Sequence, residues 1–293
     1  MKYALYIPNY GVFGDARVLA DLAKEAEDAG WDGFFLWDHI TQRDEEHGHT
    51  ENLVDPWVAL SAVALNTSTI RIGTTVTPLP RRRPWKLARE TMSLDRLSNG
   101  RLILGVGIGL GEMEWHDLGE ETDQRMRGKM LDEDLDVLTG LWSGEPFSFE
   151  GDHYHLKDAH FLPKPLQTPR IPIWVGGFWP NKAPFRRMAR WDGMFPIYLT
   201  SGPEMLKDLK ESVDFVQNQR NAAGLHGPFD VAVTGVSPGG DLEKVKVQVN
   251  DAAAAGTSWW LELLMPVVFG FSSGDDAALD VIRKRIRQGM PRV

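Results

Sequence analysis

The sequence has no cysteine in its 293 residues. This absence excludes disulfide bonds, thiol nucleophiles and thiolate metal sites, and it is compatible with a reducing cytoplasm. A surplus of basic residues is also missing, because 41 acidic side chains outnumber 32 lysines and arginines and give a formal net charge of −9. Proteins that bind nucleic acid need a basic face to displace counterions from the phosphates. We therefore expect no nucleic-acid partner.

Long apolar segments are missing as well. The first residues, MKYALYIPNYG, contain no apolar core of a signal peptide, and no run approaches the roughly 18 apolar residues that span a membrane. The composition is otherwise that of a globular protein, with 42% hydrophobic and 25% charged residues. We expect a cytoplasmic protein without a membrane partner.

Apolar runs alternate with helical patterns along the chain. Eight runs are expected as strands, at residues 3–8, 33–37, 70–77, 101–109, 172–177, 193–199, 230–236 and 259–265. A helical pattern follows each of them, at residues 16–29, 56–65, 84–97, 130–141, 182–190, 203–223, 241–255 and 274–288. Parallel strands covered by helices read as apolar runs, and eight such units favour closure of the sheet. The sequence predicts a (β/α)8 TIM barrel of the α/β class.

Residues 146–162 depart from this alternation. Apolar and polar residues alternate there on both sides of Glu150-Gly151-Asp152, which is typical of a β-hairpin. We expect this hairpin as an insertion after strand 4 of the barrel. No low-complexity linker or close internal repeat interrupts the chain, so residues 1–293 are expected to form a single domain.

Polar residues at the strand ends are the candidates for chemistry, because the active sites of TIM barrels lie at the C-terminal ends of the strands. His39 follows the second strand and is the best acid or base candidate, with Asp38 beside it to bias its charge. The alternative is an ordinary loop histidine. The other strand ends contribute Pro8 and Asn9, Thr75 to Thr77, residues 107–114, residues 176–179 and Glu262.

Glycines are concentrated at the end of the fourth strand. The segment GVGIGLGE runs from Gly105 to Glu112 and is followed by Glu114. It lets a ligand approach the backbone and leaves amide groups free to donate hydrogen bonds. Its spacing does not match the dinucleotide fingerprint G-x-G-x-x-G, and tight turns at a barrel rim explain the glycines equally well.

Two further features suggest anion binding. Gly176 and Gly177 precede a helix that contains Arg186 and Arg187, so they form either a phosphate site at a helix N-terminus or an ordinary turn. Residues 81–83 are three arginines after the third strand. They either line the path of a negatively charged cofactor tail or belong to a solvated loop.

Signatures of metal enzymes and serine hydrolases are absent. The histidines do not form an H-E-x-x-H pattern, and no G-x-S-x-G elbow is present. We therefore expect no metal. Trp37 and Trp179 stand at strand ends, where they are expected to line an apolar pocket.

Several blocks of the sequence resemble a known family. The segment RIGTTVTPLPRRRPWKLARETMSLDRLSNGRLILGVGIG closely resembles the hallmark segment of the luciferase-like flavin and coenzyme F-420 oxidoreductases. The blocks GWDGFFLWDHI, PIWVGGFW and RMARWDGMFPI also resemble family blocks and occur in the same order, and the resemblance weakens after Thr200. It implies a TIM barrel with an insertion after strand 4 and a flavin or deazaflavin ring over the strand ends.

The resemblance also implies roles for residues. Asp38 and His39 would lie near the redox ring, with His39 as the proton-transfer residue of the F-420 members. Thr75-Val76 would lie behind the ring, joined by the non-proline cis peptide bond found in many relatives. Four further residues fall in blocks that contact the cofactor in relatives, namely Gly107, Glu112, Gly176 and Gly177.

The resemblance leaves the substrate open. The segment GIGLGEMEW lacks an asparagine that is frequent in the F-420 glucose-phosphate dehydrogenases, and their sugar-phosphate-binding basic residues have no identifiable counterparts here. We expect hydride transfer between coenzyme F-420 and a small organic substrate. The alternatives are an FMN-dependent monooxygenase supplied by a partner flavin reductase, and a non-catalytic flavin-binding protein. The family implies a homodimer, but no residue pattern identifies an interface.

Overall fold

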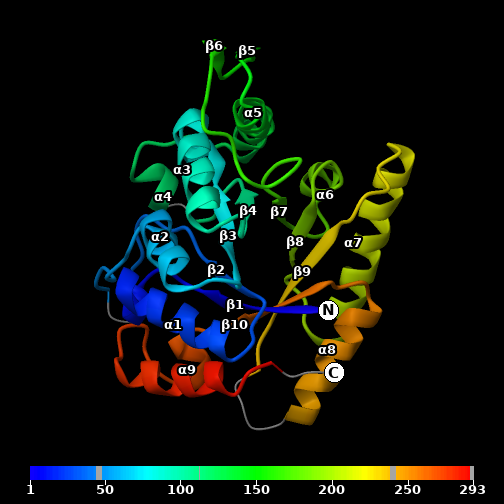
Figure 1. The fold of residues 1–293 in the computed structure, drawn as a ribbon. Helices are drawn as coiled ribbons and strands as arrows, with labels where there is room; N and C mark the ends of the chain where they lie inside the picture. The colour runs from blue at the N-terminus through cyan, green and yellow to red at the C-terminus, as the bar shows by residue number, and fades with distance from the viewer. Residues whose placement is uncertain (44–47, 112, 238–241, 291–293) are drawn as a thin grey trace.

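Eight parallel strands close into a barrel in this computed structural model, which describes residues 1–43, 48–111, 113–237 and 242–290. The strands lie in the spatial order β1-β10-β9-β8-β7-β4-β3-β2 (Figure 1). Their bounds are β1 (Lys2–Ile7), β2 (Gly33–Leu36), β3 (Arg71–Pro78), β4 (Leu102–Gly107), β7 (Ile173–Phe178), β8 (Gly193–Ile197), β9 (Asp230–Gly235) and β10 (Trp259–Leu263). The predicted (β/α)8 barrel is confirmed.

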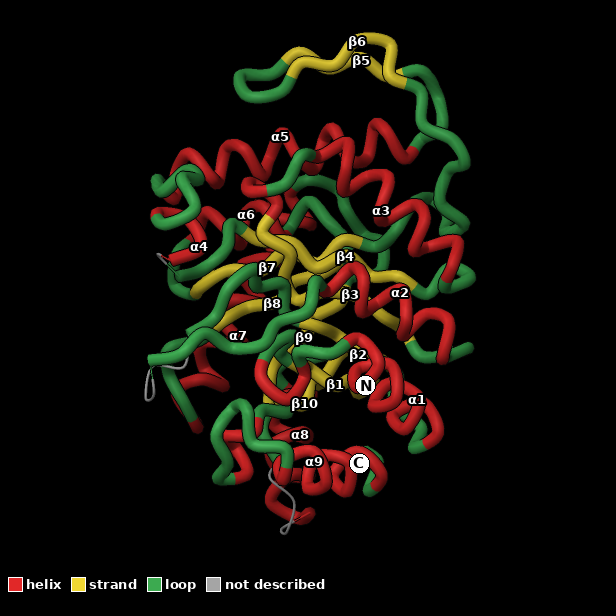
Figure 2. The backbone as a smooth tube through the Cα atoms, turned by 90° about the vertical axis from the view of Figure 1, so that its left-hand side faces the viewer, coloured by secondary structure: helices red, strands yellow, loops and turns green. Residues whose placement is uncertain are grey.

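Helices cover the outside of the barrel (Figure 2). They are α1 (Ala16–Asp28), α2 (Pro56–Asn66), α3 (Pro84–Leu97), α5 (Gln124–Trp142), α6 (Lys182–Met188), α7 (Gly202–Ala222), α8 (Leu242–Ala254) and α9 (Ala277–Arg287). Within the described residues, no helix is long and apolar enough to cross a membrane.

The segment after β4 differs most from the expected pattern. A one-turn helix, α4 (Met113–His116), precedes α5, and α5 begins at Gln124 instead of the expected residue 130. Asp123 caps α5, because its carboxylate accepts hydrogen bonds from the backbone N–H groups of Arg125 and Met126. The first turns of α5 are mainly polar, and α4 is too short to show a repeat. The spacing of apolar residues therefore predicts neither α4 nor the start of α5.

Aromatic side chains fill the inside of the barrel. The buried interior cluster consists of Ala4, Phe35, Ile103, Trp174, Phe195, Ala232, Trp259 and Leu261. Three partly buried residues, Tyr6, Val76 and Ile197, pack on this cluster from positions nearer the C-terminal strand ends. The barrel is therefore a packed core whose upper layer forms the floor of the strand-end rim.

The expected hairpin lies outside the barrel, between α5 and β7 (Figure 1). Its strands are β5 (Phe147–Glu150) and β6 (His155–Ala159), which pair antiparallel. Glu133 of α5 anchors the turn, because its carboxylate accepts hydrogen bonds from the backbone N–H groups of residues 152–154. The insertion is thus attached to the helix that follows β4.

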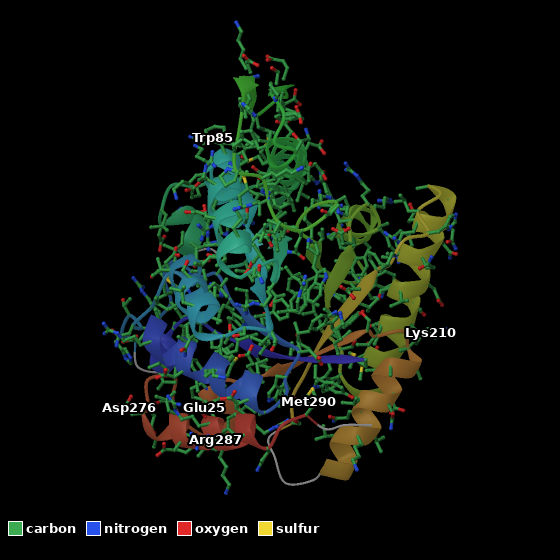
Figure 3. The ribbon with its side chains drawn as sticks, viewed as in Figure 1. Glu25, Trp85, Lys210, Asp276, Arg287 and Met290 are labelled. Carbon is green, nitrogen blue, oxygen red and sulfur yellow. The ribbon has the colours of Figure 1, made fainter. Side chains whose placement is uncertain are left out.

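The last helix closes the ring of helices against the first one. Arg287 of α9 donates a 2.8 Å hydrogen bond from Nε to Glu25 of α1, and Arg283 contacts the same carboxylate (Figure 3). Two ends of the chain that are far apart in sequence therefore lie side by side.

Glu27 of α1 connects that helix to the start of β3. Its Oε1 accepts hydrogen bonds from the backbone N–H groups of Ser68, Thr69 and Ile70 at 2.6–3.0 Å. Burial by itself raises the pKa of Glu27, but these donors outweigh it and lower the pKa to about 2, compared with an ordinary value of 4.5. A carboxyl group whose pKa is lower in the folded state stabilises the fold above its ordinary pKa.

We predict that Glu27→Gln lowers the free energy of unfolding by about 1–2 kcal/mol at pH 7. The difference from the wild type should shrink as the pH falls from about 4.5 towards 2, because the wild-type carboxylate is then protonated too. Urea unfolding at pH 7 and pH 3 measures this, with the exposed Glu145→Gln as control. An equal deficit at both pH values would contradict the role of the charge.

Candidate active site

His39 lies at the C-terminal end of β2 and contacts a glutamate from another strand end. Its Nδ1 is 3.2 Å from Oε1 of Glu114, which belongs to α4 after β4. The same oxygen accepts a 2.6 Å hydrogen bond from the backbone N–H of Ile40, and Oε2 accepts one of 2.6 Å from Arg81. The side chain of Glu114 is 4% exposed, whereas that of His39 is 26% exposed. His39 is therefore held on one side and open on the other.

Glu114 is ionised at neutral pH in this setting. Burial raises its pKa, but the hydrogen bond with His39 and the charge of Arg81 outweigh burial and lower the pKa to about 2. An ionised carboxylate only accepts hydrogen bonds, so Nδ1 of His39 carries the hydrogen that faces Glu114. This leaves Nε2 as the ring nitrogen available for proton exchange.

Asp38 has different partners from those expected. Both of its carboxylate oxygens accept hydrogen bonds from Nη2 of Arg82, at 2.7 and 2.8 Å, and Oδ2 also accepts one of 2.8 Å from Thr77. Arg81 contacts the main-chain oxygen of Asp38. The side chain of Asp38 is fully buried and joins the end of β2 to the end of β3 and the loop that follows. Glu114, not Asp38, contacts the imidazole.

The main chain of His39 is fixed by Asn9. Nδ2 of Asn9 donates hydrogen bonds to the carbonyl oxygens of His39 and Val54, at 2.9 and 2.8 Å. Oδ1 of Asn9 accepts a hydrogen bond of 3.3 Å from the backbone N–H of His39. The rings of Trp37 and Tyr10 lie 5.6 and 6.1 Å from the imidazole, between centroids. The imidazole therefore has an aromatic wall next to its charged anchor.

Val76 lies between two of the predicted glycines. An ideal Cβ on Gly107 or on Gly176 would lie 2.8 Å from a methyl carbon of Val76. The Thr75–Val76 peptide bond is cis, as predicted. Both glycines thus leave room for Val76 at the mouth of the barrel. The reason for Gly177 is different, because a Cβ there would lie 2.3 Å from Pro184 of α6.

Most arginines of the predicted anion sites pair with protein carboxylates. The side chains of Arg81 and Arg82 are 0% and 18% exposed and bind Glu114 and Asp38. Arg187 binds Asp132 of α5 at 2.7 and 2.8 Å, whereas Arg186 is exposed. The structure therefore assigns Arg81 and Arg82 to the scaffold of His39.

Three other candidates lie away from this site or are not described. Glu262 is buried beside Ser237 and Arg285 of α9, on the outer face of β10. Trp179 packs against Phe185 on the outside of the barrel. Glu112 lies outside the described residues. Within the described part of the chain, no group of three or more His, Asp or Glu residues is arranged to hold a metal ion.

Sequence reasoning missed the pairing of Glu114 with His39. Glu114 was one of several polar residues at the end of β4, and nothing in its local pattern distinguished it from its neighbours. The signal available in the sequence was that Asp38 and Glu114 follow the second and fourth strands, and that Arg81 and Arg82 follow the strand between them. Only closure of the barrel shows which carboxylate meets which base.

Comparison with known sequences gives matches over most of the chain. The family model described as luciferase-like monooxygenase matches residues 7–256. An uncharacterized protein of Mycobacterium bovis is 32% identical over 281 residues, which cover 90% of this chain and 91% of that protein. An F-420-dependent glucose-6-phosphate dehydrogenase of Microbacterium testaceum is 35% identical over 175 residues. That match covers 57% of this chain and 48% of the dehydrogenase, so it spans about half of that relative.

Comparison with solved structures supports the same fold. An F-420-dependent secondary alcohol dehydrogenase, solved in complex with an F-420–acetone adduct, matches with a TM-score of 0.76. The match covers 97% of both chains at 17% sequence identity. A likeness at this identity establishes a shared barrel fold and no more.

We predict that Gly176→Ala destabilises the protein by about 1–3 kcal/mol, because the added methyl group would overlap Val76. Val76→Ala in the same chain should remove the overlap, so the two substitutions should couple favourably by at least about 1 kcal/mol in a double-mutant cycle. Gly227→Ala is the control, since its Cβ would meet nothing within 4 Å. Additive effects at Gly176 and Val76, measured by urea unfolding, would refute the steric explanation.

Proposed function

Because the chain belongs to the luciferase-like monooxygenase family and is an oxidoreductase, we propose that it transfers hydride between coenzyme F-420 and a small organic substrate. We further propose that His39 moves the accompanying proton and that Glu114 positions it. The observation that carries this proposal is the buried, ionised Glu114 held 3.2 Å from Nδ1 of a partly exposed histidine. Such a pair is suited to exchange of a proton with a bound molecule.

The choice of coenzyme F-420 is supported by two of the similar proteins. The Microbacterium testaceum relative and the alcohol dehydrogenase of the same fold are both named as F-420-dependent. The main alternative, an FMN-dependent monooxygenase, is supported by the description of the family itself. An acid or base at position 39 favours the F-420-dependent enzyme over the monooxygenase, because removal of hydride from an alcohol requires removal of a proton as well.

The strand ends have features that fit a flat ring system. Val76 lies between Gly107 and Gly176. Because glycine has no Cβ, neither residue places a side-chain atom against Val76. The hydroxyl of Thr75 and the indole N–H of Trp37 are buried, and neither has a hydrogen-bond partner among the described residues. Buried polar groups are normally paired, so these two groups suit a bound molecule with hydrogen-bonding edges. In this proposal, the described residues next to the coenzyme are Asp38, Thr75, Val76, Gly107, Gly176 and Gly177.

The chain's own residues supply proton transfer and positioning. Coenzyme F-420, when bound, supplies the hydride chemistry. In the oxidative direction, Nε2 of His39 would accept the proton of the substrate's hydroxyl group, and the substrate oxygen would become a carbonyl oxygen when hydride passes to the bound coenzyme. In the reductive direction, the same nitrogen returns the proton to the oxygen. Glu114 stabilises the charged imidazolium in both directions and keeps the hydrogen on Nδ1.

The first test is parallel titration of the purified protein with coenzyme F-420 and FMN, followed by calorimetry. We expect micromolar binding of coenzyme F-420 and at least tenfold weaker binding of FMN. Preference for FMN would overturn the proposal in favour of a monooxygenase, which would then need a flavin reductase as partner. Binding of neither molecule would contradict both oxidoreductase mechanisms and favour loss of activity.

For the coenzyme-loaded enzyme on a panel of secondary alcohols and ketones, we predict that His39→Gln lowers kcat by about 10²–10⁴-fold. The Kd of coenzyme F-420 should stay within threefold, because the imidazole transfers a proton and does not hold the coenzyme. The control is His155→Gln, which alters an exposed histidine of the hairpin and should leave kcat unchanged. A large rise in Kd with unchanged kcat would assign His39 to binding.

Glu114→Gln removes the charge next to His39 and should lower kcat by roughly 10–100-fold, because a hydrogen bond to an ionised group is stronger than a neutral one. The Kd of the coenzyme should again change little. Glu114→Asp keeps the charge, so partial recovery of kcat relative to Glu114→Gln is expected. No difference between the two variants would mean that the charge of Glu114 is irrelevant to catalysis.

A further inference from the structure

A cavity of about 620 Å³ opens beside the candidate active site, a size within the range of small-molecule sites. It lies among three loops, those that follow β1, β2 and β10. Its lining residues of interest are Tyr10, Gln42, Arg43, Glu51, Val267 and Ser273. Among the described residues, none of these side chains forms a hydrogen bond or ion pair with His39, Asp38, Arg81 or Arg82, so the cavity is distinct from that charged network.

Backbone hydrogen bonds hold the walls of the cavity together. The N–H of Val12 donates to the carbonyl oxygen of Ser273 at 2.8 Å, and the N–H of Gly11 donates to that of Asn52 at 2.9 Å. The N–H of Glu51 donates to the carbonyl oxygen of Gln42 at 2.9 Å. Gly11 has a φ of 65°, and a Cβ there would overlap the main chain of Ser273. The described parts of the three loops therefore form a preformed wall.

Glu51 gives the cavity its chemical character. It is 7% exposed, and its carboxylate accepts a hydrogen bond from the hydroxyl of Ser273. That partner is neutral, so it does not cancel the negative charge. Arg43 also lines the cavity, but its side chain is exposed and therefore hydrated. A charge shielded from water interacts more strongly with a ligand than an exposed charge does. Glu51 therefore contributes more than Arg43 to the electrostatic interaction with a molecule in the cavity.

Tyr10 links the cavity to His39. Its ring lines the cavity and lies 6.1 Å from the imidazole of His39, between centroids. Burial, together with the nearby charge of Glu51, raises the pKa of Tyr10 to about 12, so its hydroxyl keeps its proton at neutral pH. A molecule in the cavity thus shares a wall with the group that we assign to proton transfer.

We propose that this cavity holds the end of the substrate remote from the reacting carbon. We infer that Glu51 selects a remote end that carries a hydrogen-bond donor, either a hydroxyl or an ammonium group, over a phosphate or carboxylate. The apolar lining residues Pro8, Met265, Pro266 and Phe271 take up the carbon skeleton between the two ends. The identification of the occupant as substrate rests on the proposed function, whereas the selectivity of the cavity does not.

The test uses three probes with one apolar body and different polar ends, namely cyclohexylmethanol, cyclohexylmethylamine and cyclohexanecarboxylate. Their Kd values are measured by calorimetry on the full chain, with and without coenzyme F-420. The wild type should bind the amine and the alcohol at least tenfold more tightly than the carboxylate. A fivefold difference between amine and alcohol would decide which of the two donors Glu51 prefers.

Glu51→Gln removes the charge and keeps the shape of the side chain. It should weaken amine binding at least tenfold and strengthen carboxylate binding at least fivefold. Glu145→Gln removes one negative charge from an exposed position on the α5–β5 connection and should change none of the three Kd values. Two outcomes would overturn the inference: equal wild-type affinity for all probes, or no binding at millimolar concentration.

Two further variants keep the test decisive if Glu51→Gln does not fold. Gln42→Lys adds a positive charge to the lining and should shift selectivity towards the carboxylate. Val267→Trp, at a side chain that is 67% exposed, should weaken all three probes by partly filling the cavity. Unchanged affinities in both variants would place the probes elsewhere and refute the assignment. Failure to bind coenzyme F-420 alongside intact probe selectivity would refute the proposed function alone.

Discussion

Two buried carboxylates paired with two arginines hold the ends of β2, β3 and β4 together, and the geometry of His39 depends on them. The side chains of Asp38 and Arg81 are fully buried and that of Glu114 nearly so. A buried charge is costly unless an opposite charge compensates it, so removing any member of this group would leave another buried charge without its partner. Arg81 contacts both carboxylate-bearing residues and therefore couples the two pairs.

A steric constraint operates at the same strand ends. Val76 can occupy the barrel mouth only because Gly107 and Gly176 have no side chains, and it rests on the aromatic interior that fills the barrel. Packed interiors resist deformation, so this floor is rigid. The charged network beside it and the packed interior below it together produce a fixed rim on which a bound molecule can be oriented.

Under the proposed function, chemistry and recognition are divided between two parts of this rim. The ends of β2, β3 and β4 hold His39 and Glu114, the proposed proton-transfer pair, whereas the loops after β1, β2 and β10 line the cavity that contains Glu51. Tyr10 and the loop after β2 belong to both parts. In a barrel, each strand end contributes its own loop, so the loop after β10 can vary without altering His39 or Glu114, whereas the loop after β2 cannot.

The sequence by itself determined the alternation of strands and helices, closure into a barrel, the hairpin after the fourth unit and the position of His39 at a strand end. These features follow from local periodicity and from the rule that TIM barrels carry their sites at C-terminal strand ends. The sequence pattern did not predict the start of α5, because the first turns of this helix follow the cap Asp123 and contain few apolar residues. The spacing of apolar residues does not predict the start of a helix whose first turns are polar.

Only the tertiary structure decided the partners of the charged residues. Asp38 and His39 are neighbours in sequence, but the carboxylate of Asp38 meets Arg82 and Thr77 instead of the imidazole. Of the three arginines at residues 81–83, Arg81 and Arg82 pair with the carboxylates of Glu114 and Asp38. Glu114 reaches His39 because β2 and β4 both flank β3 in the closed barrel. Sequence patterns report backbone geometry over a few residues, whereas contacts between distant strand ends exist only after the sheet has closed.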